Sequence, residues 1–541
     1  MLRGLMMDQP LLISSLLTHA AENHADTEVV SRTVEGPIHR YTYADSHQRT
    51  RQLAQALTRL GVSAGDRIAT LAWNGYRHFE LYYGTSGMGA VIHTINPRLF
   101  IEQIIYIINH AEDKLVFFDI NLAPLVEKLA AHCPTVKGWV AMTDRDHLPA
   151  LTVTALLCMD ELIDQEDGHY EWPVLDEYTA SGLCYTSGTT GNPKGVLYHH
   201  RSTVIHALAV SLPDCFSISA KDVVMPIVPM FHVNAWGTPY FGPMVGVKLV
   251  MPGAALDPKS LYELAESEQV TMSAGVPTVW LSLFAWLRSN NLKFSTLKRV
   301  VIGGSACPPS MIREFADVYG IECNHAWGMT EMSPLGTYGT LKRKHLELPI
   351  AEQFAVKVKQ GRPLYGVTMK IVDQAGDTLP RDGVAFGDLM VRGPWVTKGY
   401  FKAEGGDVLR DDWFPTGDVA TIDTDGYMGI TDRSKDVIKS GGEWISSIDL
   451  ENIAIAHPAV AEAAAIGAVH PKWDERPLLI VVRKPDAAIS REDLLQFYDG
   501  KVARWWVPDD VIFVNELPHT ATGKLLKTRL REQYGAHDWT A

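Results

Sequence analysis

Short apolar runs of strand length alternate with segments of helical periodicity through roughly the first 140 residues. Residues 67–73 (RIATLAW) and 114–119 (KLVFFD) are runs of the first kind, whereas Leu53, Leu57 and Leu60 recur at helical spacing. Parallel strands need a crossover connection, which is usually a helix, so this order predicts a parallel sheet covered by helices. The expected fold class is therefore α/β, which excludes a helix bundle or a β-sandwich.

The length of 541 residues exceeds what a single small core accommodates, and the content of 46% hydrophobic and 21% charged residues is typical of a globular protein. The composition of the sequence changes at residues 432–440 (DRSKDVIKS), which form a polar, lysine-rich stretch. About 100 residues with their own strand and helix patterns follow it. We expect a large domain of helix-covered sheets over residues 1–431, a hinge over 432–436 and a small mobile α+β lid domain over 437–541.

The net charge of −14 argues against a nucleic-acid polymer as partner, because such a partner is bound through a basic surface. It does not exclude a small anionic substrate in a local basic site. The six cysteines are scattered without metal-ligand spacing, which indicates buried, reduced thiols. No uninterrupted apolar run reaches the roughly 18 residues of a membrane span. A cytoplasmic protein is therefore expected.

The strongest local motif is YTSGTTGNPKG at residues 185–195, which follows a short apolar run. Glycines allow backbone N–H groups to approach an anion, hydroxyls donate further hydrogen bonds, and Lys194 adds a positive charge. The motif is not a Walker A loop, because Pro193 precedes the lysine and a glycine follows it. A merely flexible turn is the alternative interpretation. The predicted polyphosphate-binding residues are Thr186, Ser187, Gly188, Thr189, Thr190, Gly191 and Lys194.

This loop resembles the phosphate-binding signature of the adenylate-forming superfamily, which includes acyl-CoA synthetases, luciferases and the adenylation domains of peptide synthetases. Motifs similar to those of the superfamily follow in the same order over about 340 residues. They are VIGGSA at 301–306, AWGMTE at 326–331, TGD at 416–418 and DRSKD at 432–436. The resemblance implies an enzyme that uses ATP.

The same resemblance implies a role for each matching residue. Thr330 would hold the α-phosphate, and Glu331 would hold Mg²⁺ together with Thr186, because this hard cation needs oxygen ligands and few carboxylates. Asp418 and Arg433 would bind the ribose. The remaining ATP-binding positions implied are Gly303, Gly304, Ser305, Ala326, Trp327, Gly328 and Met329.

Two lysines of the predicted lid resemble residues that serve different steps. Lys524, in PHTATGK at 518–524, matches the adenylation lysine, and Lys439, in KSGGEW at 439–444, matches the face used in thioester formation. The resemblance implies that the lid rotates between the two steps about Lys435 and Asp436. Coenzyme A would then be a co-substrate, bound near Lys439, Gly441, Gly442, Glu443 and Trp444.

The segment PMFHVNAWG at 229–237 resembles the part of acyl-CoA synthetases that lies between the acyl pocket and the thiol tunnel. His232 would be a gate or positioning residue there, although a packed core histidine is the alternative. Large or rigid groups at the expected lining positions predict a short apolar pocket. The implied lining residues are His232, Trp236, Gly303, Trp327 and Pro334.

Taken together, the motifs are most similar to those of bacterial medium-chain fatty-acid CoA ligases and 3-(methylthio)propionate CoA ligases. We predict an ATP-dependent ligase that joins a short- to medium-chain carboxylic acid to CoA through an acyl-adenylate, releasing AMP and pyrophosphate. A luciferase-like oxygenase and a carrier-protein-directed adenylation enzyme share the ATP motifs and remain alternatives. A non-enzymatic binding protein would have no use for two lysines in separate motifs that serve different reaction steps. A homodimer is expected from the family.

Overall fold

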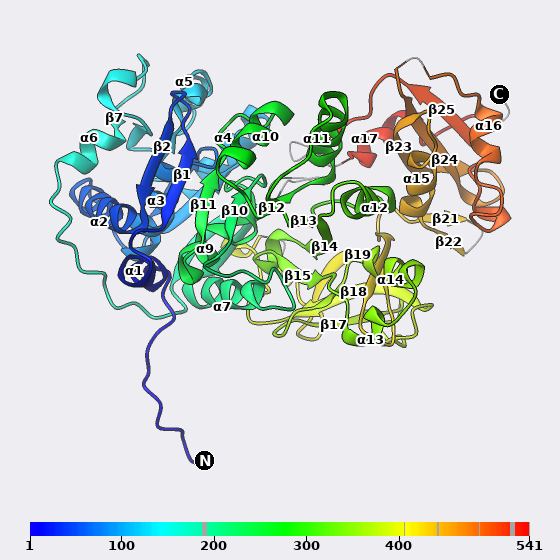
Figure 1. The fold of residues 1–541 in the computed structure, drawn as a ribbon, viewed down its shortest axis with the longest axis horizontal. Coiled ribbons are helices and arrows are strands. Elements are labelled where there is room, and N and C mark those ends of the chain that lie inside the picture. Colours follow the sequence, from blue (N-terminus) through cyan, green and yellow to red (C-terminus); the bar gives the residue numbers. More distant parts are fainter. Residues whose placement is uncertain (187–191, 405, 441–442, 486, 520–524, 540–541) are drawn as a thin grey trace.

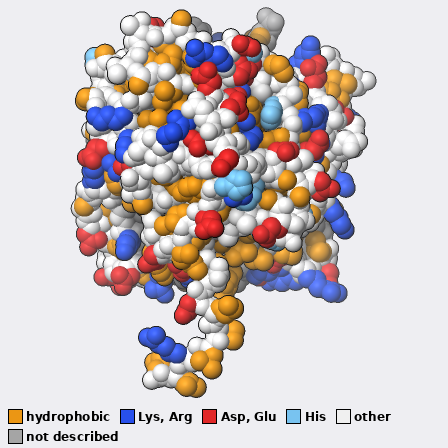
Figure 2. Space-filling view, turned by 90° about the vertical axis from the view of Figure 1, so that its left-hand side faces the viewer, with side chains coloured by type: hydrophobic (Ala, Val, Ile, Leu, Met, Phe, Trp, Pro, Cys, Tyr) orange, Lys and Arg blue, Asp and Glu red, His pale blue; other side chains and the backbone are white. Residues whose placement is uncertain are grey.

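A computed structural model describes residues 1–186, 192–404, 406–440, 443–485, 487–519 and 525–539. The chain forms two adjoining sheets with helices, a smaller sheet beside them, and a C-terminal unit at one end of the molecule (Figure 1). The N-terminal segment projects from the body, as Figure 2 shows from the side. It carries exposed Met1, Leu2, Leu5, Met6 and Met7.

The first sheet has seven strands and matches the predicted strand and helix alternation. Its strands β3 to β8 run parallel, and only β9 at one edge is antiparallel. The order is β7 (Leu156–Cys158), β6 (Gly138–Ala141), β5 (Leu115–Phe118), β3 (Arg67–Leu71), β4 (Val91–Ile95), β8 (Ala180–Tyr185) and β9 (Gly195–His199).

Both faces of this sheet are covered, which explains why its strands are apolar throughout. On β3, Ile68 packs toward α2 (Tyr43–Arg59) and α3 (Tyr76–Gly87), whereas Leu71 packs toward α4 (Ile101–Ala111) and α5 (Ala123–Ala130). Helix α2 begins with a reciprocal capping box between Thr42 and Asp45. A short helix, α6 (Met159–Asp164), packs against α2.

The second sheet has nine strands, of which β1, β11, β10, β12, β13 and β14 run parallel. The order is β16 (Arg362–Pro363), β15 (Leu335–Tyr338), β14 (Glu322–Gly328), β13 (Arg299–Ile302), β12 (Met272–Gly275), β10 (Val223–Pro226), β11 (Lys248–Met251), β1 (Glu28–Arg32) and β2 (Ile38–Thr42). One core includes residues of α1 (Ile13–Asn23), α7 (His200–Ser211) and α9 (Thr238–Val245), and another those of α10 (Pro258–Ser267), α11 (Pro277–Asn290) and α12 (Pro309–Asp317).

A four-stranded, wholly antiparallel sheet follows, which the predicted parallel arrangement did not include. Its strands are β17 (Thr368–Val372), β18 (Phe386–Arg392), β19 (Phe414–Ile422) and β20 (Met428–Arg433). Helices α13 (Arg343–Leu346) and α14 (Ile350–Lys357) precede it. The last strand of the sheet, β20, includes the first two residues of the predicted hinge, so the sheet positions the start of the C-terminal unit.

The C-terminal unit is a five-stranded mixed sheet with its own core of Ile438, Leu479 and their neighbours. Its helix α16 (Arg491–Gln496) begins with a capping box between Ser490 and Asp493. The strands are β21 (Ile438–Ser440), β22 (Glu443–Ile445), β23 (Val460–His470), β24 (Asp474–Arg483) and β25 (Asp510–Val514), with helices α15 (Ser447–Ile455), α16 (Arg491–Gln496) and α17 (Lys527–Tyr534).

The predicted fold class, a large domain of helix-covered sheets with a smaller α+β unit, is confirmed by this architecture. All six cysteines are buried, and none is in a disulfide. Within the described part of the chain, no helix combines the length and the apolar character that a bilayer crossing requires.

Candidate active site

The glycine-rich segment is the hairpin loop that joins β8 to β9. At its base the Thr186 N–H donates to the Lys194 carbonyl at 2.9 Å, and the Lys194 N–H donates to Thr186 Oγ1 at 3.1 Å. The base is thus closed by the first hydroxyl and the lysine of the motif. Ser187, Gly188, Thr189, Thr190 and Gly191 lie outside the described residues, so their predicted role stays a prediction.

The glycine turn after β13 packs against the indole ring of Trp236. A Cβ atom at Gly303 would lie 3.2 Å from that ring and 2.9 Å from the Ala326 carbonyl oxygen, so only glycine fits without a shift. Gly304 has φ +80° and continues the turn, while Ser305 is exposed. The structure therefore brings together two predicted acyl-pocket residues, Trp236 and Gly303, from segments about 70 positions apart.

Trp236 is held there by an uncommon backbone. In the short helical turn α8 (Val233–Trp236), all four residues have positive φ, between 44° and 56°. Such a left-handed turn costs about 1–2 kcal/mol per residue for L-amino acids. Asn234, a residue type that tolerates this region, also accepts a hydrogen bond from the buried Tyr82 hydroxyl at 3.0 Å. This strained turn lies beside the predicted pocket, and backbone strain often occurs at functional sites.

Thr330 and Glu331, predicted to hold the α-phosphate and the metal, lie in the tight connection between β14 and β15. Gly328 is required there, because a Cβ would come within 2.0 Å of the Pro334 carbonyl oxygen. Thr330 and Glu331 are both buried, and the Tyr198 hydroxyl donates to the Thr330 carbonyl at 2.6 Å. Ala326, Trp327, Met329 and Pro334 belong to the same antiparallel hairpin, so this motif forms one compact unit.

The two predicted ribose-binding residues are in direct contact. Arg433 Nε lies 3.0 Å from Asp418 Oδ1, and their strands β19 and β20 are paired at these residues. The other carboxylate oxygen, Oδ2, accepts a hydrogen bond from Trp327 Nε1 at 3.0 Å. Asp418 is buried, so both contacts orient its carboxylate. Trp327 thereby joins the ribose residues to the predicted acyl pocket.

Glu331 has a neighbour that the sequence motifs did not indicate. The Tyr400 hydroxyl donates to Glu331 Oε1 at 2.8 Å, and burial beside this carboxylate raises the pKa of Tyr400 well above its usual value. The Lys194 ammonium lies 4.9 Å from the centre of the same ring. Tyr400 therefore connects two predicted site residues that are 137 positions apart.

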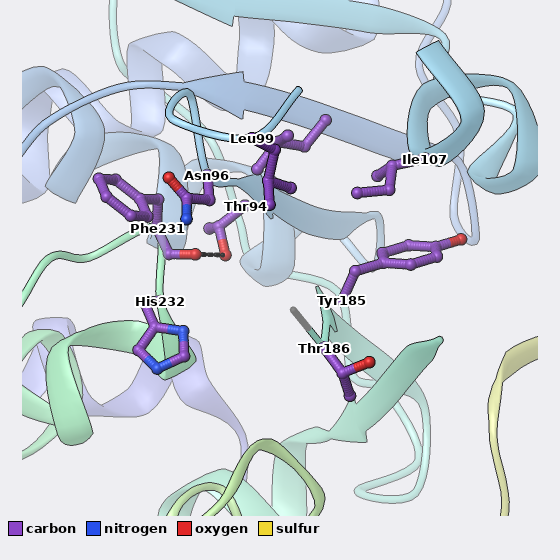
Figure 3. Close-up of a pocket in the computed structure, with 9 residues that line it drawn as sticks. Thr94, Asn96, Leu99, Ile107, Tyr185, Thr186, Phe231 and His232 are labelled. Atoms are coloured by element: carbon purple, nitrogen blue, oxygen red, sulfur yellow. Dashed lines mark hydrogen bonds between the residues drawn. The ribbon is translucent and has the colours of Figure 1, made fainter. Parts of the chain in front are cut away.

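A cavity of about 20 Å³ opens at the carboxyl ends of β4 and β8, where ligands of parallel α/β sheets commonly bind (Figure 3). Half-buried His232 lines it, which favours its predicted position beside a pocket over that of a packed core histidine. Across the cavity, Thr94 Oγ1 donates to the Phe231 carbonyl at 3.4 Å. The other lining residues are Ile95, Asn96, Leu99, Ile107, Tyr185 and Thr186.

Of these lining residues, the sequence motifs indicated only His232 and Thr186. Residues 94–99 comprise the end of β4 and the loop after it, and β4 is hydrogen-bonded to β8, the strand that leads into the glycine-rich loop. The pairing of those two strands is a tertiary contact that no local sequence motif indicates. A hint was nevertheless available, because both loops follow apolar runs and would share one edge of a parallel sheet.

The C-terminal unit contributes residues whose predicted roles depend on its motion. Asp436 pairs with Arg531 of α17, and burial lowers the pKa of Lys435. Lys439 is exposed on β21, where its N–H donates to Glu475 Oε2 at 2.8 Å. Its strand pairs with β22, of which the backbone at Glu443 and Trp444 is described. Gly441, Gly442 and Lys524 lie outside the described residues.

The donor set at Glu331 and Thr186 suits a magnesium ion that arrives with a nucleotide. Both side chains offer hard oxygen donors, and Mg²⁺ is typically held by one or two carboxylates together with substrate phosphates. In the described residues, no group of three or more His, Cys, Asp or Glu side chains is arranged to hold a metal. The residues present therefore fit a metal bound through ATP rather than a resident protein-only centre.

Comparisons with known proteins identify the family of the chain. The AMP-binding enzyme family model matches residues 17–401, and the model of the AMP-binding enzyme C-terminal domain matches residues 449–524. The chain therefore belongs to the AMP-binding, adenylate-forming enzyme family.

Relatives narrow the class further. The chain is 55% identical over 531 residues to a 3-methylmercaptopropionyl-CoA ligase of Ruegeria pomeroyi, with 98% of both chains covered. It is 54% identical to a medium-chain-fatty-acid–CoA ligase of Ectopseudomonas oleovorans, with 98% and 97% covered. The predicted class of enzyme, an AMP-forming acid–CoA ligase, is thereby confirmed.

Solved structures show the same fold. An anthranilate CoA ligase crystallised with anthranoyl-AMP superimposes with a TM-score of 0.85 at 23% identity, over 97% of this chain and 98% of the other. ATP-bound MatB from Rhodopseudomonas palustris gives a TM-score of 0.80 at 25% identity, over 96% and 99%.

Proposed function

We propose that this chain activates a short, unbranched carboxylic acid, such as 3-(methylthio)propionate or a short- to medium-chain fatty acid, as its CoA thioester. The observation that carries the substrate class is the packing of Trp236 over the Gly303 turn. An indole ring at this predicted lining position would close one side of the acyl pocket. A ring in this place limits the length of an acid tail. The names of the relatives at 54–55% identity support the same class of acid.

In the first half-reaction, the acid carboxylate attacks the α-phosphorus of ATP and pyrophosphate leaves. Negative charge develops on phosphate oxygens, so the enzyme's task is positioning and electrostatic stabilisation rather than proton transfer. Thr330 would donate to the α-phosphate, Lys194 would meet the polyphosphate, and Asp418 with Arg433 would hold the ribose. The proposal also gives Lys524 a stabilising role at the reacting phosphate.

Glu331 and Thr186 would hold Mg²⁺, which supplies charge neutralisation on the phosphate oxygens when bound. Glu331 is buried and is oriented by Tyr400, so its carboxylate is held in one place before the nucleotide arrives. This arrangement reduces the reorganisation needed when charge develops.

In the second half-reaction, the CoA thiol attacks the acyl carbonyl and AMP leaves. A free thiol is already a few per cent ionised near neutral pH, so no dedicated base is required. The lid would rotate about Lys435 so that Lys439 and the residues after it replace Lys524. We also propose that the enzyme is cytoplasmic and forms a homodimer. Light scattering on the purified chain would test the homodimer.

The test is a panel of straight-chain acids from C3 to C10 and 3-(methylthio)propionate, with Mg-ATP and CoA. AMP and acyl-CoA are followed by mass spectrometry. We expect equal amounts of AMP and thioester, with the highest kcat/KM among the shorter acids. A product that needs ATP but not CoA would instead favour a luciferase-like or carrier-directed enzyme, and a preference for long chains would contradict the proposed pocket.

A further inference from the structure

Tyr400 occupies the space between two groups that the proposed adenylation reaction uses. It lies in the loop after β18, just before Phe401, and is half-buried. Its hydroxyl donates to Glu331 Oε1 at 2.8 Å, and the face of its ring meets the Lys194 ammonium at 4.9 Å. Neither contact pairs two strands of a sheet or caps the end of a helix. Both engage residues that would bind the metal and the phosphates.

The hydrogen bond constrains how the Glu331 carboxylate is turned. A carboxylate has two oxygens with about four lone-pair directions, so a donor at Oε1 constrains the rotation of the group about its bond to the side chain. The loop of Tyr400 is also fastened to Glu331 by the main chain, because the Thr397 N–H donates to the Glu331 carbonyl at 2.8 Å. The donor and the acceptor are therefore held in register.

The ring contact acts on a different group. The face of an aromatic ring carries negative charge density, which attracts an ammonium ion placed over it. Lys194 is the lysine of the glycine-rich motif, and its main chain closes the base of that loop with Thr186. The Tyr400 ring therefore gives the long Lys194 side chain a preferred direction, while packing against buried Cys184, Val196 and Tyr198.

We propose that Tyr400 is a positioning residue for the adenylation half-reaction: its hydroxyl orients Glu331 toward Mg²⁺, and its ring directs Lys194 toward the phosphates of ATP. This inference rests on the proposed function, in which Glu331 holds the metal of Mg-ATP. The two roles belong to different atoms of one side chain. They can therefore be separated by substitution.

Tyr400→Phe removes the hydroxyl and keeps the ring, whereas Tyr400→Leu removes both. Mn²⁺ in place of Mg²⁺ is titrated by electron paramagnetic resonance in the presence of a non-hydrolysable ATP analogue, and analogue binding without metal is measured by calorimetry. A hydrogen bond to a charged group contributes a factor of about ten or more, so we expect Tyr400→Phe to weaken metal binding about tenfold. Metal-free analogue binding should be unchanged in Tyr400→Phe and weaker in Tyr400→Leu.

Both variants should form thioester from presynthesised acyl-adenylate and CoA at the parental rate, which shows that the fold and the second half-reaction are intact. Tyr427→Phe is the matched control: this buried tyrosine also loses its hydroxyl, which donates to the Thr340 carbonyl at 2.7 Å and lies 3.4 Å from His345 Nδ1, away from the site. Its metal affinity should equal that of the parent.

Parental metal affinity in Tyr400→Phe would overturn the inference, as would an equal loss of both half-reactions, which would make the role of Tyr400 structural only. Failure of the proposed function has a different signature. In that case the parent chain itself would release no AMP with any acid of the panel, whatever residue 400 is.

Discussion

In the proposed acyl pocket, Trp236 would be the side chain with the most influence on which acid the enzyme accepts. Its ring lies against the Gly303 turn, and the left-handed backbone of α8 presents it there. A buried methylene contributes about 0.8 kcal/mol, which is roughly a factor of four in affinity. The preference among acids that differ by a few carbon atoms would therefore depend on the longest acid that the pocket accommodates.

Trp236→Ala should consequently move the preference to longer acids. We expect kcat/KM to fall for the shortest acids, which lose apolar contact, and to rise about fourfold for each added methylene until the new space is filled. The measurement is kcat/KM across the C3 to C10 panel. Trp286→Ala, which removes a half-buried indole on α11 that contacts Tyr262, should leave the profile unchanged. An unaltered profile in Trp236→Ala would place the acyl tail elsewhere.

The two lysines of the C-terminal unit should be separable by half-reaction. Lys524→Ala should abolish acyl-adenylate formation and spare thioester formation from presynthesised adenylate, because its charge is needed only while phosphate oxygens gain charge. Lys439→Ala should have the opposite pattern. Pyrophosphate exchange reports the first step, and the release of AMP from added acyl-adenylate reports the second. Equal losses in both steps for either variant would refute its assignment.

At this scale, contiguous motifs were predictable and contacts between distant positions were not. Asp418 and Arg433 could be assigned to one ligand because each stands in its own recognisable motif, and the structure places them 3.0 Å apart. Tyr400 was missed because its partners, Glu331 and Lys194, come from other segments. No local pattern marks a tyrosine that contacts residues 69 and 206 positions away.

Helix α7 is attached to the hairpin of Thr330 and Glu331 through one buried histidine. His206 Nε2 accepts a hydrogen bond from the Leu335 N–H of β15 at 3.2 Å, and its ring meets Trp395 edge-on. Burial lowers the pKa of His206 to about 3, so the ring is neutral in the folded protein at any moderate pH. Protonation would remove the acceptor and leave a buried charge.

This histidine should make stability depend on pH in the acid range. In the unfolded chain a histidine has a pKa of about 6.5, so between pH 6.5 and 3 the unfolded state binds more protons than the folded state. The contribution of His206 is complete above pH 6.5 and is lost as pH falls, by up to about 1.4 kcal/mol per pH unit. His206→Gln keeps an acceptor that does not titrate.

We therefore expect the free energy of unfolding of His206→Gln to fall less steeply between pH 6.5 and 4.5 than that of the parent, by about 2–3 kcal/mol over the window. Urea denaturation at several pH values measures it. At pH 7.5 the variant should be somewhat less stable, because the amide fills the ring's space less well. Parallel stability curves for the two proteins would show that His206 is not the titrating group.

Among elements, the parallel strands were the predictable part of the fold. Strands such as β3, β4 and β5 are apolar because helices cover both faces of their sheet, and that run of residues is visible in sequence. The antiparallel sheet of β17 to β20 was not foreseen. In β18, buried and more exposed residues alternate over only part of the strand, and its partners are set by pairing across long loops rather than by periodicity.

For the whole molecule, the decisive feature is how the chain passes from the large sheets to the C-terminal unit. It leaves β20 at Arg433 and enters β21 at Ile438, so a short turn connects them. The turn is flanked by contacts: the Ser447 N–H of α15 donates to Asp432 Oδ2 at 2.6 Å, and Asp436 pairs with Arg531 of α17. Arg433, at the end of β20, also contacts Asp418 of the ribose site. Any rotation of the unit would therefore begin beside the proposed ribose site.

If the unit must rotate between the two half-reactions, restricting the turn should block passage from one to the other. Proline fixes φ near −65° and restricts the residue before it, so Lys435→Pro should hold the unit in one arrangement. We expect one half-reaction, assayed alone, to keep a rate near that of the parent, while the other half-reaction and the complete reaction fall at least tenfold. Lys435→Ala, which removes the side chain without restricting the backbone, should keep both within a few-fold. A proline variant that performs both half-reactions at parental rates would show that they share one arrangement of the unit. Rotation would then no longer explain why two lysines serve different steps.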